Sequence, residues 1–197
     1  MNQHSLWDTF YKTNKKWGKE TLTLPNVCTH KRVLELGCGN GKTLKAILKQ
    51  NPSEVVALDF SAQALIQVQE AIADPRVTFI QADVTHLPVH LGTFDIIVCY
   101  YLLNNFTLSA QKKLITSLKA FLAPQGILLI EEYAQGDHRE QQTSPFQRTF
   151  LSKEQLTKLL EGYEINTLTE HSFSPYKHAQ NKREIIRASA TLSASSN

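Results

Sequence analysis

The sequence predicts a doubly wound α/β domain, in which helices cover both faces of a mostly parallel β-sheet. Two observations support this fold class. Short apolar runs alternate along the chain with segments whose apolar residues recur at helical spacing. The 197 residues are enough for one domain with a continuous core, and 42% hydrophobic and 20% charged residues are ordinary for a globular protein.

Strand and helix signals follow one another closely in the first two thirds of the chain. The predicted strands are residues 32–36, 55–58, 77–80, 94–99 and 127–130. Between the first two strands, Leu44, Ile47 and Leu48 form the apolar face of a helix. Ser61 is the expected N-cap of the next helix, and Ser109 is expected to open the helix after the fourth strand.

The last third of the chain departs from this rhythm. Residues 124–126 (Pro-Gln-Gly) predict a turn into the fifth strand, and residues 133–148 form a long polar segment. Long loops in compact domains are often functional. Ser152 begins a sequence with capping-box spacing, which predicts a short helix. Strand-like segments at 163–170 and 183–190 then predict an antiparallel pair at the sheet edge.

The first strand runs into a glycine-rich turn that holds Gly37, Gly39 and Gly41. Glycines let the backbone turn tightly and let a ligand approach closely, which indicates a nucleoside-binding turn. A nicotinamide-dinucleotide fingerprint needs its third glycine at position 42, where this chain has Lys42. A P-loop needs a glycine where Leu36 stands. Both phosphate-binding interpretations are therefore disfavoured, although an NAD(P)-dependent oxidoreductase stays the rival enzyme class.

Three acidic residues lie at the ends of three consecutive predicted strands. A carboxylate at Glu35, beside the turn, suits a cationic ligand rather than a pyrophosphate. Asp59 could accept both hydroxyls of a ribose, and Asp83 could accept the exocyclic amine of an adenine. The alternatives are that Asp59 caps the next helix and that Asp83 only ends a strand. The carboxyl ends of parallel strands share one sheet edge, so a common ligand site is favoured.

These segments together resemble the motifs of class I S-adenosylmethionine-dependent methyltransferases. The segments concerned are residues 33–41, 58–61, 81–83, 94–98 and 122–128, within a similarity covering 31–132. The resemblance implies a Rossmann-like, seven-stranded sheet, mostly parallel with an antiparallel C-terminal strand. It also implies S-adenosyl-L-methionine as cofactor, S-adenosyl-L-homocysteine as product, and no metal. The cofactor-binding residues expected from it are Glu35, Leu36, Gly37, Cys38, Gly39, Gly41, Asp59, Phe60, Ser61, Asp83, Val84, Cys99 and Tyr100.

Residues that contact the methyl acceptor are expected after the fourth strand, after the fifth strand and near the N-terminus. The candidates are Tyr11, Tyr100, Asn104, Asn105, Tyr133 and His138. Many relatives carry histidine at the positions of Asn104 and Asn105, whose amides can only orient a substrate. His138 could act as a base near neutral pH, but a solvated loop histidine is the favoured alternative. Packing explains Tyr100 as well as substrate contact does.

The N-terminal segment is rich in aromatic residues and lysines between residues 7 and 18. It could close over the cofactor as a lid, or pack an extra helix on the sheet. We therefore expect one methyltransferase domain over residues 1–197. Its expected parts are a helical lid or extension at 1–30, a cofactor-binding core at 31–132, an acceptor-side region at 133–190 and a tail at 191–197.

A narrower resemblance links the chain to the eukaryotic enzymes that methylate the 3-position of cytidine in tRNA. It rests on residues 7–14, 59–61 and 132–138 and on Phe150, but that family's Asp-Arg-His-Trp segment is missing here. Lysines and an arginine could neutralise tRNA phosphates, namely Lys12, Lys15, Lys16, Lys19, Lys177, Lys182 and Arg183. A small-molecule acceptor is the main expectation, and the alternatives are a tRNA base methyltransferase or a catalytically silent S-adenosylmethionine-binding protein.

The composition of the chain disfavours several other kinds of partner and site. A formal net charge of +3 is too mild to argue for a nucleic-acid partner by itself. Cys28, Cys38 and Cys99 form no Cys-x-x-Cys pair, so neither zinc nor disulfides are expected. No apolar run is long enough for a membrane span. We expect a cytoplasmic protein without a membrane partner, as a monomer or a homodimer.

Overall fold

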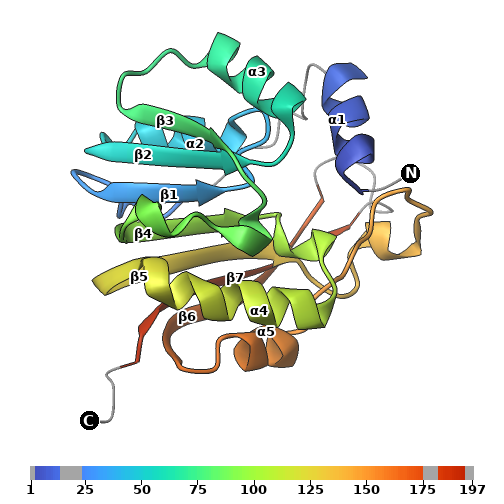
Figure 1. Ribbon diagram of the computed structural model, residues 1–197. Helices are drawn as coiled ribbons and strands as arrows, with labels where there is room; N and C mark the ends of the chain where they lie inside the picture. Colours follow the sequence, from blue (N-terminus) through green and yellow to red (C-terminus); the bar gives the residue numbers. More distant parts are fainter. Residues whose placement is uncertain (1–2, 14–23, 175–181, 194–197) are drawn as a thin grey trace. The chain divides into compact units, whose positions relative to one another are not determined.

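A computed structural model describes residues 3–13, 24–174 and 182–193 of the chain. Its seven strands form one sheet in the order β3-β2-β1-β4-β5-β7-β6 (Figure 1). β1 pairs with β2 and β2 with β3 in parallel, whereas β7 is antiparallel to both β5 and β6. The predicted fold class, a mostly parallel α/β sheet with a reversed C-terminal strand, is confirmed.

The element bounds agree with the predicted order. The strands are β1 (Arg32–Leu36), β2 (Glu54–Asp59), β3 (Val77–Gln81), β4 (Phe94–Tyr100), β5 (Leu122–Tyr133), β6 (Tyr163–Phe173) and β7 (Arg183–Leu192). The α-helices are α1 (Gln3–Thr13), α2 (Lys42–Leu48), α3 (Ala62–Ala71), α4 (Leu108–Leu118) and α5 (Lys153–Leu159). Short 3-10 helices are η1 (Val84–His86), η2 (Val89–Leu91), η3 (Leu103–Asn105), η4 (Lys119–Phe121) and η5 (His138–Gln141).

The chain divides into two compact units, residues 1–98 and 99–197, with the boundary inside β4. The first unit holds β1, β2 and β3 together with α1, α2 and α3. Both β1 and β2 are almost completely buried and mostly apolar between their charged residues, as expected of strands covered on both faces. α1 packs beside α3 (Figure 1), so the N-terminal segment contributes a helix to this unit.

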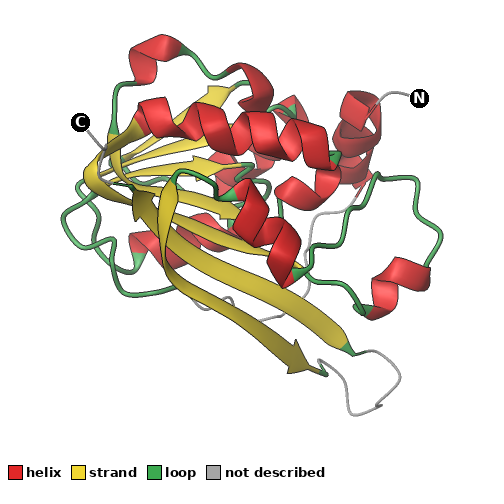
Figure 2. Cartoon of the chain, turned by 90° about the horizontal axis from the view of Figure 1, so that it is seen from below, coloured by secondary structure: helices red, strands yellow, loops and turns green. Residues whose placement is uncertain are grey.

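The second unit holds β5, β7 and β6, with α4 and α5. β7 lies between β5 and β6, and Figure 2 shows β6 and β7 as a long pair of neighbouring strands. The phenol of Tyr163, the first residue of β6, donates a buried hydrogen bond of 2.8 Å to the Ile115 carbonyl of α4. The predicted antiparallel pair is confirmed, and residues 175–181 between the two strands lie outside the described residues.

Helix caps follow local sequence chemistry. Ser61 accepts the Ala64 N–H and caps α3, and Ser152 completes the predicted capping box of α5. The prediction that Ser109 opens α4 is wrong by two residues. Thr107 has the extended backbone of an N-cap and its hydroxyl accepts the Ala110 N–H, so Ser109 lies inside the helix.

β5 is longer than predicted. It runs over Leu122–Tyr133 and includes the predicted turn at 124–126, where Gln125 has φ of +63°. The pairing of β5 with β7 begins only at Ile127, so residues 122–126 are an irregular start to the strand rather than a separate turn. The following segment, predicted to be irregular, contains η5 and a single bridge between Ala134 and Leu151.

Candidate functional site

The glycine-rich turn joins β1 to α2 in the first unit. Gly37, Gly39 and Gly41 have φ values of +69°, +51° and +80°, in the left-handed region that L-residues with side chains rarely adopt. The Cys38 N–H donates to the Leu58 carbonyl of β2 at 2.8 Å, which anchors the turn at the end of the neighbouring strand. The turn therefore has the conformation that the glycine pattern predicts.

Two of these glycines also lie too close to neighbours to carry a side chain. A Cβ at Gly39 would lie 2.6 Å from the Tyr11 hydroxyl oxygen of α1. A Cβ at Gly41 would lie 2.6 Å from Val68 and 2.7 Å from Ile72. Gly41 therefore lets α3 pack against the turn, whereas Gly39 lets the phenol of Tyr11 lie over it.

Glu35 lies beside the turn with a buried carboxylate. Its side chain is 2% exposed, and its Oε2 has no hydrogen-bond partner among the described residues. Burial, and then the charge of Asp59, raise the pKa of Glu35 well above its ordinary value, although a bond from the Leu44 N–H acts in the opposite direction. A buried acceptor without a partner is unfavourable. Glu35 is thus suited to receive a cationic or N–H-donating group from a ligand.

Asp59 ends β2 and holds two backbone groups. Its Oδ2 accepts the Gly39 N–H at 2.8 Å, and its Oδ1 accepts the Ser61 N–H at 2.9 Å. Burial raises the pKa of Asp59, and these N–H bonds oppose that shift. Each carboxylate oxygen can accept a second bond, so the side chain can serve both the turn and a ligand hydroxyl.

Asp83 follows β3 and caps η1. Its Oδ1 accepts the Thr85 N–H and hydroxyl at 2.8 and 2.7 Å. Partial burial raises its pKa, but bonds from Thr85 and the charge of His4 outweigh this and leave the pKa below its usual range. The second oxygen lies 3.9 Å from the His4 ring, and Val84 is buried beside it.

α1 contacts each of these predicted cofactor-binding segments. His4 lies near Asp83 and its ring centroid is 4.4 Å from that of Phe60. Asp8 accepts the Ser61 hydroxyl at 2.5 Å, and Tyr11 lies over Gly39. The structure thus brings Tyr11, predicted as an acceptor-side residue, next to the predicted cofactor-binding turn.

The other predicted cofactor residues are buried or nearly so. Leu36 and Cys38 are buried in and after β1, and Cys99 and Tyr100 are buried at the end of β4, in the second unit. Burial raises the pKa of the Cys38 and Cys99 thiols, which therefore stay neutral. The contacts of these four residues do not test whether they bind the cofactor, so this role stays a prediction.

The turn after β4 contains the predicted acceptor-side asparagines. Asn104 is buried, and its amide donates to the Glu132 carboxylate at 2.9 Å. Asn105 donates to the Leu102 carbonyl at 3.0 Å. Both amide nitrogens thus stabilise the turn itself, and contact of either residue with an acceptor stays a prediction.

A cluster of aromatic rings lies in the second unit. Tyr133 has its ring centroid 4.7 Å from that of Tyr101 and 6.4 Å from that of Phe150. The guanidinium carbon of Arg139 lies 3.4 Å from the centre of the Tyr133 ring, a cation–π contact. Tyr101 and Arg139 were not predicted from the sequence. Tyr101 is a non-glycine residue with φ of +54°, a backbone feature that the sequence does not reveal.

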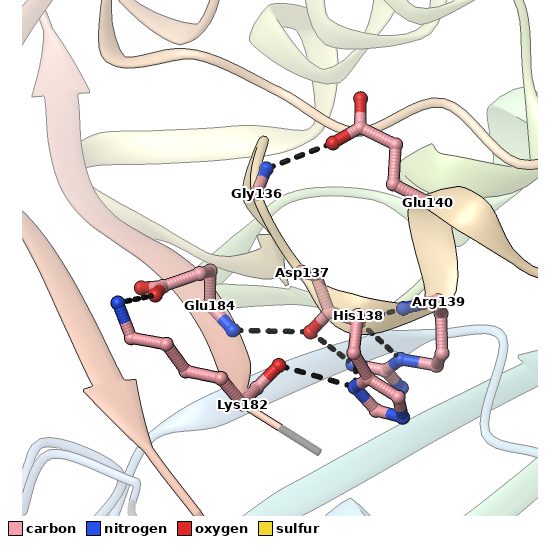
Figure 3. A network of polar contacts seen from close by, with 7 residues as sticks. All are labelled: Gly136, Asp137, His138, Arg139, Glu140, Lys182 and Glu184. Carbon is pink, nitrogen blue, oxygen red and sulfur yellow. Dashed lines mark hydrogen bonds and ion pairs between the residues drawn. The ribbon is translucent and has the colours of Figure 1, made fainter. Parts of the chain in front are cut away.

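The segment predicted to be a functional loop is held by a polar network (Figure 3). The buried Asp137 accepts bonds of 2.7 Å from Nε and Nη2 of Arg139 and one of 3.0 Å from the Glu184 N–H. The ring of His138 lies 3.1 Å from the Lys182 carbonyl, which also accepts the His138 N–H. This network ties η5 to the start of β7 and fixes Arg139 against Tyr133.

Asp137→Asn is expected to destabilise the protein by about 3 kcal/mol, because removing one partner of a buried ion pair leaves the other uncompensated. Burial raises the pKa of Asp137, but the bonds from Arg139 outweigh it, so the pKa lies below its usual range. The stabilisation is therefore present above the usual aspartate pKa and is lost as the pH falls through the folded-state value. Urea unfolding at neutral and acidic pH measures both effects.

Asp74→Asn is the matched control for this prediction. Asp74 binds Arg76 with the same two-residue spacing and the same pair of nitrogens, at 2.9 and 2.6 Å, but near the surface. Solvent screens such a pair, so its removal should change the urea midpoint little. Equal losses from the two variants would show that burial does not make the Asp137 pair special.

Other kinds of site are not evident in the described parts of the chain. Residues 3–13, 24–174 and 182–193 contain no group of three or more His, Cys, Asp or Glu side chains that could hold a metal ion. The three cysteines are buried and unbridged. Over the same ranges, every helix is too short or too polar to span a bilayer.

Residues 33–126 match the protein family described as "Methyltransferase domain". This segment, just under half of the chain, is similar to a methyltransferase domain. The matched segment runs from β1 to the irregular start of β5, and it includes the glycine turn, Glu35, Asp59 and Asp83. The predicted resemblance to methyltransferases is therefore confirmed.

Curated relatives of the methyltransferase domain act on different substrates. A demethylmenaquinone methyltransferase from Lactiplantibacillus plantarum is 32% identical over 131 residues, which cover 64% of this chain and 54% of that protein. A human tRNA N(3)-cytidine methyltransferase is 32% identical over 115 residues, covering 54% and 30% respectively. The chain thus spans about half or less of the length of these relatives.

Solved structures support the fold of the methyltransferase domain. An S-adenosylmethionine-dependent methyltransferase from Anabaena variabilis superimposes with a TM-score of 0.74 at 16% identity, covering 98% of this chain and 96% of that one. The N-methyltransferase NodS from Bradyrhizobium japonicum, in complex with S-adenosyl-L-homocysteine, has a TM-score of 0.68 at 15% identity, covering 84% and 80%. At these identities the similarity concerns the fold alone.

Proposed function

We propose that this chain is an S-adenosylmethionine-dependent methyltransferase. The observation that carries the proposal is the buried, unpartnered Glu35 oxygen beside a glycine turn whose three positive φ values are typical of a nucleoside-binding turn. The ammonium group of a methionine moiety would satisfy that oxygen. The match to a methyltransferase domain makes S-adenosyl-L-methionine the ligand that fits both features.

The proposed roles of the other residues follow from their positions. Asp59 would bind the ribose hydroxyls through its remaining lone pairs, and Asp83 and Val84 would bind the adenine beside Phe60. When bound, S-adenosyl-L-methionine supplies an activated methyl group on a sulfonium. The chain therefore has to orient the ligand, align the acceptor and exclude water. A general base is needed only if the acceptor must lose a proton.

We propose a small molecule as the acceptor. The demethylmenaquinone methyltransferases among the relatives act on a substrate of this kind and are 30–35% identical to this chain over the matched residues. The aromatic cluster formed by Tyr101, Tyr133 and Phe150 offers rings for a planar acceptor to contact. This acceptor region belongs to the second unit, and the proposed cofactor residues from Glu35 to Val84 belong to the first.

A tRNA base is the second candidate acceptor, since tRNA N(3)-cytidine methyltransferases match 54–57% of this chain's length in three species. Of the cations expected to contact phosphates, Lys15, Lys16, Lys19 and Lys177 lie outside the described residues. Lys12 is exposed on α1, and Lys182 forms an ion pair with Glu184. A catalytically silent, S-adenosylmethionine-binding protein is the third candidate.

Titration calorimetry and radiolabelled methyl transfer separate these candidates. We expect S-adenosylmethionine and S-adenosylhomocysteine to bind, and NADH not to bind. Label from S-adenosylmethionine should pass to demethylmenaquinol, the reduced form of the quinone, or to a ribonuclease-resistant fraction of a lysate. Label in a ribonuclease-sensitive fraction would favour tRNA, and binding without transfer would favour the silent protein. Binding of NADH alone would contradict the proposed function.

α1 is proposed to act as a lid over the cofactor. Asp8→Ala should speed S-adenosylmethionine dissociation by about 10-fold, because about 1.4 kcal/mol of charge-assisted hydrogen bonding to Ser61 is lost. Stopped-flow fluorescence measures the rate. Thr9→Ala is the matched control, since the exposed Thr9 hydroxyl donates only to the Ser5 carbonyl of its own helix. Equal dissociation rates in the two variants would contradict the lid role.

A further inference from the structure

Glu132, near the end of β5, has a buried carboxylate that only neutral groups bind. It is 0% exposed, and its Oε1 accepts the Leu103 N–H at 2.5 Å. Its Oε2 accepts the Asn104 side-chain amide at 2.9 Å and the Asn104 N–H at 3.3 Å. None of the described Lys, Arg or His side chains forms an ion pair with it. An ionised carboxylate in such a place is unfavourable unless its partners are fixed around it.

The groups that Glu132 binds all belong to the turn that follows β4. This turn begins at Tyr101, whose φ of +54° is unusual for a residue with a large side chain. The Tyr101 N–H donates to the Glu131 carbonyl at 2.7 Å, which attaches the start of the turn to β5. Glu132 holds the next part of the turn through Leu103 and Asn104. Two consecutive residues of β5 thus determine the course of the turn.

A second segment is bound to the same turn. The Thr149 N–H donates to the Asn104 carbonyl at 2.8 Å, and the Thr149 hydroxyl donates to the Phe106 carbonyl at 2.8 Å. Thr149 precedes Phe150, one of the three rings of the aromatic cluster. Tyr101 begins the turn and Tyr133 follows Glu132 directly. The Glu132 carboxylate therefore lies at the junction of the three backbone segments that carry these rings.

We propose that Glu132 is a positioning residue for the methyl acceptor: its ionised carboxylate holds the turn at residues 101–105, and with it the ring of Tyr101 against Tyr133. Protonation of Glu132 replaces an acceptor oxygen with a hydroxyl group and releases part of the turn. The inference rests on the proposed function, because it assigns the aromatic cluster to the acceptor.

Glu132 is expected to gain or lose its proton near neutral pH. Burial raises its pKa to about 7, although the bonds from Asn104 and Leu103 act in the opposite direction. The titratable groups that face it are Cys99 of β4, Tyr101 of the turn and Tyr133 of its own strand. Burial raises the pKa of each of these three groups, so they stay neutral. We therefore expect the turn to be held above about pH 7 and loosened below it.

Hydrogen exchange and NMR of the full chain test the release of the turn without any acceptor. The amide protons of Leu103 and Asn104 should shift together between pH 5.5 and 8.5, with a midpoint near 7. Their protection against exchange, relative to the intrinsic rate at each pH, should be lower at the acidic end. Wild-type amides that do not titrate would overturn the inference. Glu132→Gln should abolish the titration, since an amide cannot lose a proton in this range.

Kinetics with demethylmenaquinol or unmodified tRNA as the probe test the consequence for the acceptor. Glu132→Gln should lower kcat/KM for the acceptor by roughly 100-fold and flatten the acidic limb of the pH profile, while the S-adenosylmethionine Kd stays within about 2-fold. Glu132→Asp should recover part of the activity because it keeps the charge. An unchanged kcat/KM and pH profile in Glu132→Gln would overturn the inference.

Gln111→Met is the matched control. The Gln111 amide donates to the Leu103 and Phe106 carbonyls at 2.8 and 3.0 Å, so the variant loosens the same turn without removing a titratable group. It should lower activity but keep the wild-type pH profile, and a flattened profile would overturn the role of Glu132. If wild-type protein binds no S-adenosylmethionine, the proposed function fails, and the NMR titration still decides whether Glu132 controls the turn.

Discussion

Asp59→Ala is expected to weaken S-adenosylmethionine binding by at least about 100-fold, since hydrogen bonds to a charged group contribute about 1.5–3 kcal/mol each. The substitution removes the proposed ribose contact. It also leaves the Gly39 and Ser61 N–H groups without their buried acceptor, so the glycine turn loses its connection to the end of β2. Titration calorimetry measures the affinity.

Two variants separate the ligand contact from the support of the turn. Asp59→Asn keeps an oxygen for one N–H group but directs an amide at the other, so it should bind S-adenosylmethionine weakly and fold nearly normally. Asp95→Ala is the matched control, because the Asp95 carboxylate accepts the Arg32 N–H at 2.9 Å at the opposite end of β1. It should lose stability and keep its affinity. Wild-type affinity in Asp59→Asn would contradict the ribose assignment.

The fold was predictable where local chemistry and periodicity agree. The glycine turn, the Ser61 cap and the Ser152 capping box each depend on residues within a few positions of one another. The wrong predictions concern positions where the local sequence is compatible with two structures. Thr107 and Ser109 are both good N-caps, and the structure uses Thr107. Residues 124–126 read as a turn, although the backbone carries them as the irregular start of β5.

The candidate site was predictable in part for the same reason. Glu35, Asp59 and Asp83 each lie within two residues of the end of a strand, so their positions could be derived from the order of elements. The contact of Tyr11 with the turn could not, because it depends on how α1 packs against α3. The sequence predicts Tyr100, and not Tyr101, as a site residue, because only the backbone shows which of the two tyrosines leaves the strand.

Glu35 connects the stability of the protein to its proposed cofactor. Because burial, followed by the charge of Asp59, raises its pKa, the folded protein holds a proton there that the unfolded chain releases at lower pH. The contribution of Glu35 to stability is then most favourable at acidic pH and is lost as the pH rises above about 4.3, toward the folded-state pKa. Glu35→Gln needs no ionisation, so the variant without ligand should be more stable than wild type at neutral pH.

Binding should show the opposite preference. A cationic group on the ligand favours ionised Glu35, so S-adenosylmethionine affinity should rise with pH through the folded-state pKa and binding should release a proton. Calorimetry in two buffers with different ionisation enthalpies counts that proton. Glu35→Gln should bind about 10- to 100-fold more weakly, as for the loss of one charged hydrogen bond, and without proton release. Glu54→Gln removes a partly exposed carboxylate that pairs with Arg32, and should bind as wild type does. A Glu35→Gln protein with wild-type affinity and the same proton release would mean that the unpartnered oxygen serves another purpose.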